Sequence, residues 1–167
     1  MRVLGIDPGY AILGWGIIEM KGNHFTPIYF GAITTDPANS MSARLLDIYH
    51  GLNQIIDTYK PEVVSIEQLF FNTNSKTAIL VSQARGVALL AAAEKSLPIF
   101  EYTPLQIKQA LVGYGRAEKN QVQQMVKTIL SLEKIPKPDD TADALAAAVC
   151  YCHSAGYSKR LQASMVK

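Results

Sequence analysis

Apolar residues near the start of the chain occur in short runs that predict three consecutive β-strands. The segment RVLGID over 2–7 is the first, and AILGWGIIEM over 11–20 follows it after the turn DPGY over 7–10. The segment HFTPIYFGAITT over 24–35 has the same β-prone character. Because their connections are short, we expect these strands to pair antiparallel.

The spacing of apolar residues then changes to the three-to-four-residue period of an amphipathic helix. Apolar side chains recur with this period from Leu45 to Ile56, Ser40 offers an N-cap, and Pro61 follows the last turn. A helix is therefore predicted over about 40–59.

The rest of the chain alternates single strands with helices. The predicted elements are a strand over 62–67, a helix over about 75–95, a strand over 97–102, and helices from Thr103 to the glycines of VGYG, over about 117–132 and over about 140–155. Three antiparallel strands followed by parallel crossovers predict an α/β fold, with a mixed five-stranded sheet flanked by helices.

The length of 167 residues suits one domain, which we assign to residues 1–157, with 158–167 as a C-terminal tail free to flex. Because no apolar run approaches the roughly 18 residues of a membrane span and the N-terminus does not suit a signal peptide, we expect a cytoplasmic protein without membrane contact. Cys150 and Cys152 have a spacing unsuited to a disulfide or a zinc site, so we interpret them as reduced packing residues.

Charge is divided unevenly along the chain, although the net charge is only +2. Residues 1–69 carry four basic and seven acidic side chains, whereas residues 70–167 carry twelve and seven. The division permits a basic binding face in the second part, but scattered solvated lysines explain it equally well.

Four carboxylates stand out by position. Asp7 ends the first predicted strand and Glu67 the fourth, while Asp140 and Asp143 lie one turn apart on the last helix. Asp7 in a DPG sequence is also a common turn residue, and Asp140 with Asp143 also matches an N-cap followed by an acid in the first turn. Glu67 is harder to explain structurally, because an acid that ends a buried strand needs a partner or a metal.

Brought together, these four acids would repel one another unless cations lay between them. Oxygen ligands favour Mg²⁺ or Mn²⁺, and two such ions about 3.5–4 Å apart activate water and stabilise the leaving oxygen of a phosphodiester. We therefore predict that all four acids are catalytic residues and metal ligands for phosphodiester hydrolysis. The chain has no GxSxG, Walker A or HExxH sequence, and its three histidines are scattered.

Five separated motifs, in order, resemble the RuvC family of bacterial Holliday-junction resolvases. They are IDPG at 6–9, SIEQLFF at 65–71, SQARGVAL at 82–89, AEKNQVQ at 117–123 and DDTADALA at 139–146, and the similarity covers roughly residues 1–155. The resemblance implies a ribonuclease H-like fold, a homodimer, Mg²⁺ dependence and symmetric nicking of two strands at a four-way DNA junction. It also implies the branch-migration proteins RuvA and RuvB as partners.

The four acids match the acids of the family's motifs, and some relatives carry histidine at the position of Asp140. Candidate DNA-binding residues come from the resemblance or lie near its motifs: Phe70, Phe71, Lys108, Lys119, Arg85 and Arg116. The resemblance implies base contact or stacking for Phe70, although either ring could instead pack under its loop. Lys119 begins a helix where backbone N–H groups and a cation suit a phosphate, and an ordinary solvated lysine is the alternative.

The helix over about 75–95 is rich in small residues, so it is either a core helix or the interface of a two-fold homodimer. Two other functions compete with the nuclease. A sugar-kinase or actin-like ATPase also begins with a strand and an Asp-x-Gly turn, but needs a second domain. A non-catalytic junction-binding module would use the acids only as caps and turns.

Overall fold

The computed structural model describes residues 1–69 and 75–165, with side chains described for residues 1–69 and 77–155. Five strands form one sheet: β1 (Arg2–Asp7), β2 (Ile12–Lys21), β3 (His24–Thr34), β4 (Val63–Glu67) and β5 (Ile99–Tyr102). Their order is β3-β2-β1-β4-β5, in which β1 pairs antiparallel with β2, and parallel pairs join β1 to β4 and β4 to β5. The predicted mixed sheet is confirmed.

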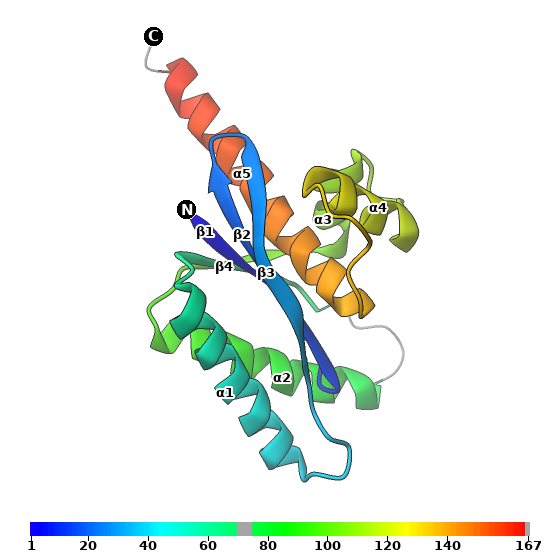
Figure 1. Cartoon of the computed structure of the whole chain (residues 1–167). Coiled ribbons are helices and arrows are strands. Elements are labelled where there is room, and N and C mark those ends of the chain that lie inside the picture. The colour runs from blue at the N-terminus through cyan, green and yellow to red at the C-terminus, as the bar shows by residue number, and fades with distance from the viewer. Residues whose placement is uncertain (70–74, 166–167) are drawn as a thin grey trace.

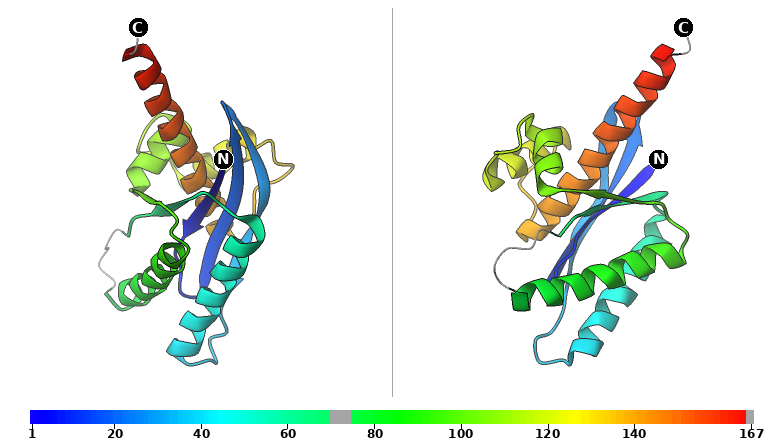
Figure 2. Two further views of the ribbon diagram at one scale, coloured as in Figure 1. Left: turned by 90° about the vertical axis from the view of Figure 1, so that its left-hand side faces the viewer. Right: turned by 180° about the vertical axis from the view of Figure 1, so that it is seen from behind.

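Helices cover both faces of this sheet, as Figures 1 and 2 show. Helices α1 and α2 pack together on one face, and α3 and α4 pack with α5 on the other. Their bounds are α1 (Met41–Tyr59), α2 (Ser75–Glu94), α3 (Pro104–Val112), α4 (Lys119–Ile129) and α5 (Asp139–Met165).

The helix starts follow from local capping chemistry. The Ser40 side chain accepts a hydrogen bond from the N–H of Ala43, and Thr103 forms a reciprocal capping box with Gln106. At α4 the N–H of the N-cap residue Glu118 donates to the Gln121 side chain at 2.8 Å, so α4 begins at Lys119 and is shorter than the predicted helix over about 117–132.

The last helix differs from its prediction at both ends. It begins at Asp139, so Asp140 lies in its first turn, and the alternative in which Asp140 serves as the N-cap does not hold. It also continues to Met165, because no proline interrupts the sequence after residue 155. Most of the predicted tail over 158–167 is therefore helical, while its flexibility stays a prediction.

Two apolar clusters hold the three layers together. One lies between the sheet and α1 with α2, and the other between the sheet and α3, α4 and α5. Val3 and Leu4, neighbours on β1, are both fully buried in opposite clusters, as expected of a central strand with helices on both faces.

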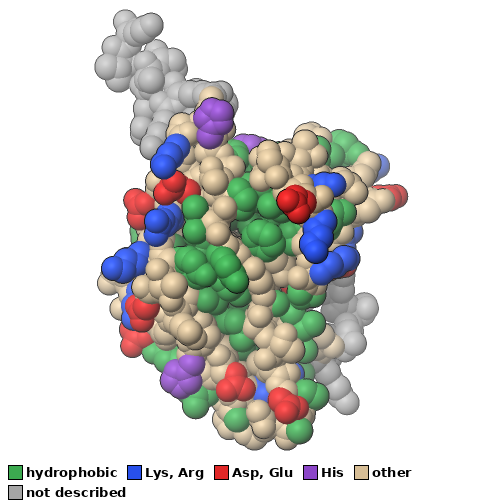
Figure 3. All heavy atoms as spheres, in the orientation of Figure 1, with side chains coloured by type: hydrophobic (Ala, Val, Ile, Leu, Met, Phe, Trp, Pro, Cys, Tyr) green, Lys and Arg blue, Asp and Glu red, His purple; other side chains and the backbone are tan. Residues whose placement is uncertain are grey.

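On the face that β3 crosses, hydrophobic side chains gather near the middle of the space-filling view (Figure 3). Contacts among the rings of Trp15, Tyr29 and Tyr59 join β2, β3 and α1, with centroids 5.7–6.0 Å apart. Trp15 belongs to the first apolar cluster and Tyr59 packs against it, so the ring contacts join Tyr29 of β3 to that cluster.

One described helical segment, Thr77–Glu94 of α2, is long and apolar enough to cross a membrane by length and composition, with a mean hydropathy of 1.2. The segment contains Gln83 and Arg85, so it is not an uninterrupted apolar run of the kind that the sequence expectation excluded. Length and composition alone are weak grounds for a membrane span. The small apolar residues of α2 that face the sheet, including Ala84, Ala88 and Ala91, are buried against it.

Candidate active site

Asp7 and Glu67 lie at neighbouring strand ends on the same face of the sheet. The parallel register pairs Ile6 of β1 with Ile66 of β4, so the two acids are the next residues along adjacent strands. Side chains alternate between faces along a strand. Ser65, two residues before Glu67, donates its hydroxyl hydrogen bond to the Ala147 carbonyl of α5 at 2.6 Å, so this face is the one that α5 covers.

Glycines on β1 and β2 let the backbone of α5 lie directly on the sheet. A Cβ added at Gly5 would come within 2.0 Å of the Ala144 carbonyl oxygen, and one added at Gly14 within 1.9 Å of the Asp140 carbonyl oxygen. Gly14 is the residue that pairs with Asp7 across the antiparallel strands. The first turn of α5 is thus seated beside Asp7, where a larger residue on β2 would hold it away.

This packing brings Asp140 and Asp143 to the strand ends that carry Asp7 and Glu67. The carboxyl of Asp7 interacts electrostatically with Glu67, Asp143 and Asp140, and that of Glu67 with Asp143. Four acids far apart in the sequence therefore form one cluster, which we call the acid cluster.

Burial and mutual repulsion make three carboxyls of the acid cluster harder to ionise. The pKa of Asp7 is raised to about 8, first by burial and then by the nearby carboxylates of Glu67, Asp143 and Asp140, while Lys119 opposes the shift. Burial is also the main cause that raises the pKa of Glu67 to about 7 and the pKa of Asp143 above its usual value. Metal ions would remove this electrostatic cost by supplying positive charge.

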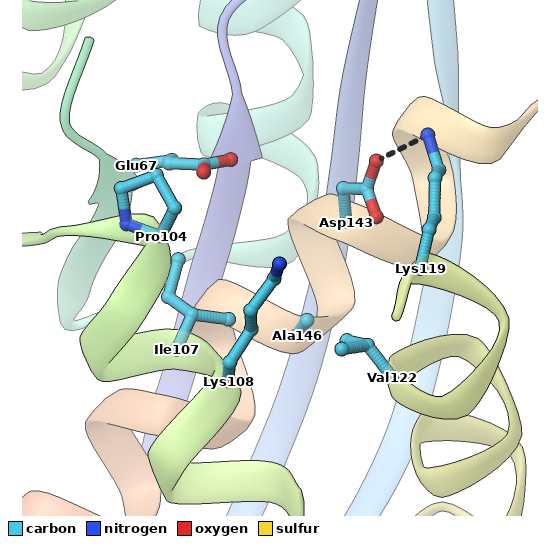
Figure 4. A pocket seen from close by; sticks show the side chains of 8 residues that line it. All are labelled: Glu67, Pro104, Ile107, Lys108, Lys119, Val122, Asp143 and Ala146. Atoms are coloured by element: carbon cyan, nitrogen blue, oxygen red, sulfur yellow. Dashed lines mark ion pairs between the residues drawn. The ribbon is translucent and has the colours of Figure 1, made fainter. Parts of the chain in front are cut away.

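A cavity of about 220 Å³ opens beside the acid cluster (Figure 4). Glu67 and Asp143 reach it from β4 and α5, and Lys108 and Lys119 reach it from α3 and α4. Apolar side chains complete its wall: Pro104, Ile107, Val122 and Ala146. The cavity therefore presents acids and two lysines on an apolar base, which suits a phosphate held next to cations.

Lys119 is already engaged with the acids. Its ammonium lies 2.9 Å from a carboxylate oxygen of Asp143 and 3.6 Å from one of Asp139. The side chain is still 56% exposed, so the pair is weak and open to exchange with another anion. Asp139, which also pairs with Lys137, was missed from the sequence, although the doublet at 139–140 placed an acid there.

The four acids offer the type of ligand atom that divalent metal ions prefer. Asp7, Glu67, Asp140 and Asp143 supply carboxylate oxygens, the donors that Mg²⁺ and Mn²⁺ prefer, and two of these groups are costly to ionise without a cation nearby. Within the described part of the chain, no three His, Cys, Asp or Glu side chains approach closely enough to form a coordination site. The four carboxylates are near enough to interact electrostatically, but they are not arranged as the ligands of one ion.

The other candidate DNA-binding residues are spread more widely. Arg85 of α2 pairs with Glu101 of β5 at 2.5 Å and lines a separate polar pocket, so it does not join the acid cluster. Arg116 is exposed in the connection between α3 and α4. Phe70 and Phe71 lie outside the described residues.

Cys150 and Cys152 are free and buried, and burial raises the pKa of each thiol to about 12. The prediction that they are reduced packing residues is confirmed. Their thiols are too weakly acidic to act as nucleophiles near neutral pH.

Comparison with known proteins agrees over almost the whole chain. The profile of the family described as "Crossover junction endodeoxyribonuclease RuvC" matches residues 3–151. A protein of that name from Caldanaerobacter subterraneus subsp. tengcongensis is 59% identical over 161 residues, which cover 96% of this chain and 98% of the relative. One from Clostridioides difficile is 56% identical, covering 97% and 96%.

Solved structures give the same result. The structure of Thermus thermophilus RuvC has a TM-score of 0.87 at 36% identity, covering 95% of this chain and 97% of that one. T. thermophilus RuvC in complex with Holliday junction substrate has a TM-score of 0.90 at 36% identity, covering 95% and 96%.

Proposed function

The chain belongs to the RuvC family of crossover junction endodeoxyribonucleases, and from this premise we propose how it cuts a Holliday junction. The ribonuclease H-like fold expected from the sequence is confirmed by the match to T. thermophilus RuvC. The chain is a structure-specific endonuclease that hydrolyses phosphodiester bonds during recombination and repair. The family membership also removes the ATPase and the non-catalytic module as alternatives.

The acid cluster carries the proposal for the catalytic residues. Asp7, Glu67, Asp140 and Asp143 would hold Mg²⁺, or Mn²⁺ in its place, as two ions per active site. When bound, the ions would supply Lewis acidity for the attacking water and for the leaving oxygen. The observation that supports this assignment is that acids from β1, β4 and α5 meet at adjacent strand ends, where burial and the neighbouring carboxylates raise the pKa values of Asp7 and Glu67.

The chain's own residues would bind and orient the DNA. Lys108 and Lys119 line the cavity beside the acids, where each could contact a phosphate of the scissile strand. Lys119 would exchange its pair with Asp143 for that phosphate and so leave Asp143 free for a cation. Arg116 and the aromatic residues Phe70 and Phe71 are proposed DNA contacts from the sequence, whereas Arg85 is a weaker candidate because Glu101 neutralises it.

Symmetric cleavage requires two active sites related by a two-fold axis, and we propose a homodimer through α2. Large apolar side chains are left exposed on this helix: Ile79 is 58% and Leu90 61% accessible. Gly86 lies between them at helical spacing, with open space where a Cβ would be, so another helix could approach closely. The stripe formed by Ile79, Gly86 and Leu90 is the α2 stripe.

RuvA and RuvB remain proposed partners on the resemblance alone. The DNA-junction substrate of the family supports the proposed cytoplasmic location.

The direct test is cleavage of a synthetic four-way junction. We expect paired nicks at symmetric positions when Mg²⁺ or Mn²⁺ is added, and binding without nicking in EDTA. A linear duplex of the same sequence is the control for structure specificity. Junction binding with no metal-dependent cleavage would contradict the proposed active site.

A further inference from the structure

The turn between β1 and β2 directly follows Asp7 and is held from outside by β3. The backbone N–H of Thr35 donates to the Ala11 carbonyl at 3.0 Å, and its hydroxyl donates to the Tyr10 carbonyl at 2.8 Å. Thr35 is only 3% exposed, so these bonds are shielded from water. Thr35, the residue that follows β3, therefore holds the two consecutive carbonyls of Tyr10 and Ala11 in the turn.

Arg44, in the first turns of α1, completes this arrangement. Its Nε donates to the Thr35 hydroxyl oxygen at 2.8 Å, while its guanidinium carbon lies 3.9 Å from the centre of the Tyr10 ring. The Thr35 hydroxyl thus accepts from Arg44 and donates to the turn. Arg44 also covers the turn's aromatic side chain by a cation–π contact.

The turn itself has little room to adjust. A Cβ added at Gly9 would lie 1.8 Å from the Ile12 carbonyl oxygen, so only glycine allows this close return of the chain. In Figures 1 and 2 the connection from β3 to α1 runs past this turn, consistent with the bonds from Thr35. A displacement of the turn would be passed directly to Asp7, two residues before Gly9.

Arg44 contacts the turn but is not the cation that acts electrostatically on Asp7. Lys119 of α4 is the cation that lowers the pKa of Asp7. Arg44 instead contacts a ring and a hydroxyl, groups that set the position of the backbone.

We propose that Tyr10, Thr35 and Arg44 form a clamp that holds the β1–β2 turn and thereby positions Asp7 for metal binding. They are positioning residues, since they act on the metal through Asp7. The proposal rests on the proposed function, in which Asp7 is a metal ligand. Groups that hydrogen-bond directly to a metal ligand change metal affinity by about 10- to 100-fold when they are removed, and since the clamp acts on Asp7 through the turn backbone, we expect an effect at the lower end of that range.

The test is Mn²⁺ binding to the full-length protein, measured by electron paramagnetic resonance without DNA. Thr35→Val keeps the shape of the side chain but loses the hydroxyl, and Thr35→Ser restores the hydroxyl. Thr34→Val makes the same change at the exposed neighbouring position. Arg44→Ala removes the other half of the clamp, and Asp7→Asn provides the reference for a lost ligand.

We expect Thr35→Val and Arg44→Ala to weaken Mn²⁺ binding about tenfold at temperatures well below their unfolding transitions. Thr35→Ser and Thr34→Val should bind like the wild type, and near-UV circular dichroism should show every variant folded. Cleavage by Thr35→Val should recover at high Mn²⁺ concentration, as a weakened site requires. A purely structural role would lower the melting temperature and leave the affinity of the folded protein unchanged.

The outcomes separate the clamp from the active site. If Asp7→Asn weakens Mn²⁺ binding but Thr35→Val and Arg44→Ala do not, the clamp is overturned and the proposed function stands. Equal weakening by Thr34→Val and Thr35→Val would also overturn the clamp, since the hydroxyl would not be the cause. If Asp7→Asn binds Mn²⁺ like the wild type, the proposed metal site fails and the clamp fails with it.

Discussion

At the scale of single residues, the chemistry centres on Asp7. Its carboxyl is surrounded by three other acids and partly buried, so the folded protein binds its proton tightly in the absence of metal. The same property makes it a strong candidate to bind a cation, because a cation offsets the burial and the repulsion together.

Asp7→Asn should keep junction affinity and lose cleavage. The amide preserves the size of the side chain but carries no charge to hold a cation. We expect the cleavage rate to fall by about a hundredfold or more, equivalent to roughly 3 kcal/mol of transition-state stabilisation. Single-turnover cleavage and a gel-shift titration in EDTA measure the two quantities separately. Cleavage near the wild-type rate would remove Asp7 from the catalytic set.

The pKa of Asp7 also predicts how stability depends on pH without metal. Its folded value of about 8 lies above the ordinary 3.8, so between these values the folded chain holds a proton that the unfolded chain has released. The free energy of unfolding must therefore fall as pH rises from about 4 to 8, by at most about 1.4 kcal/mol per pH unit for one proton. Glu67 adds to this trend up to about pH 7.

Thermal melts in EDTA across this pH range test the dependence. Asp7→Asn should flatten it and raise the melting temperature at pH 8, because the buried charge is gone. Added Mn²⁺ should stabilise the wild type at pH 8 and have a smaller effect on the variant. Identical pH profiles for wild type and variant would show that Asp7 does not titrate in this range.

Lys119→Ala should weaken DNA binding and reduce its salt dependence. If the lysine contacts one phosphate, its loss should lower the slope of log affinity against log salt by about 0.9. Lys127→Ala removes the same charge near the other end of α4 and serves as the control. A slope equal to that of the control would identify Lys119 as ordinary surface charge.

At the scale of elements, the contact of α5 with the sheet places half of the active site. The helix crosses β1 and β2 where glycines leave its backbone in contact with theirs. Ala144, Ala147 and Ala148 of α5 are fully buried, so small side chains on both surfaces permit the close approach. Asp140 and Asp143 reach Asp7 because of this contact.

Gly14→Ala tests the contact. The new methyl group would overlap the backbone carbonyl of Asp140. A backbone group cannot move aside as the end of a flexible side chain can. We expect a destabilisation of about 1–3 kcal/mol, typical of overpacking, and a greater loss of cleavage than of junction binding. Urea denaturation measures the first and the cleavage assay the second.

At the scale of the whole molecule, the exposed apolar residues of α2 bear on assembly. Leu90→Lys should convert a dimer into a folded monomer. In an apolar two-fold contact, the lysines of the two subunits would lie close together and repel each other. Light scattering coupled to gel filtration measures the mass. Ile28→Lys, at another exposed apolar position, controls for the added charge. A dimer that survives Leu90→Lys would place the interface elsewhere.

The sequence by itself determined the local structure. The five strands and the first four helices were predicted close to their observed positions, because hydrophobic periodicity, capping residues and glycines act over a few neighbouring residues, whereas the last helix extends well beyond its predicted end. The mixed sheet followed from the order of those elements. Glu67 was recognised because an acid at the end of the apolar run VVSI is costly wherever the strand lies.

Which of these residues come into contact is seen only in the folded protein. The register of β1 with β4 sets Asp7 beside Glu67, and Gly14 admits the first turn of α5. The pair of Lys119 with Asp143 and the bonds of Thr35 to the turn likewise join residues distant in sequence. Such contacts depend on packing between whole elements, and no pattern along a single element contains that information.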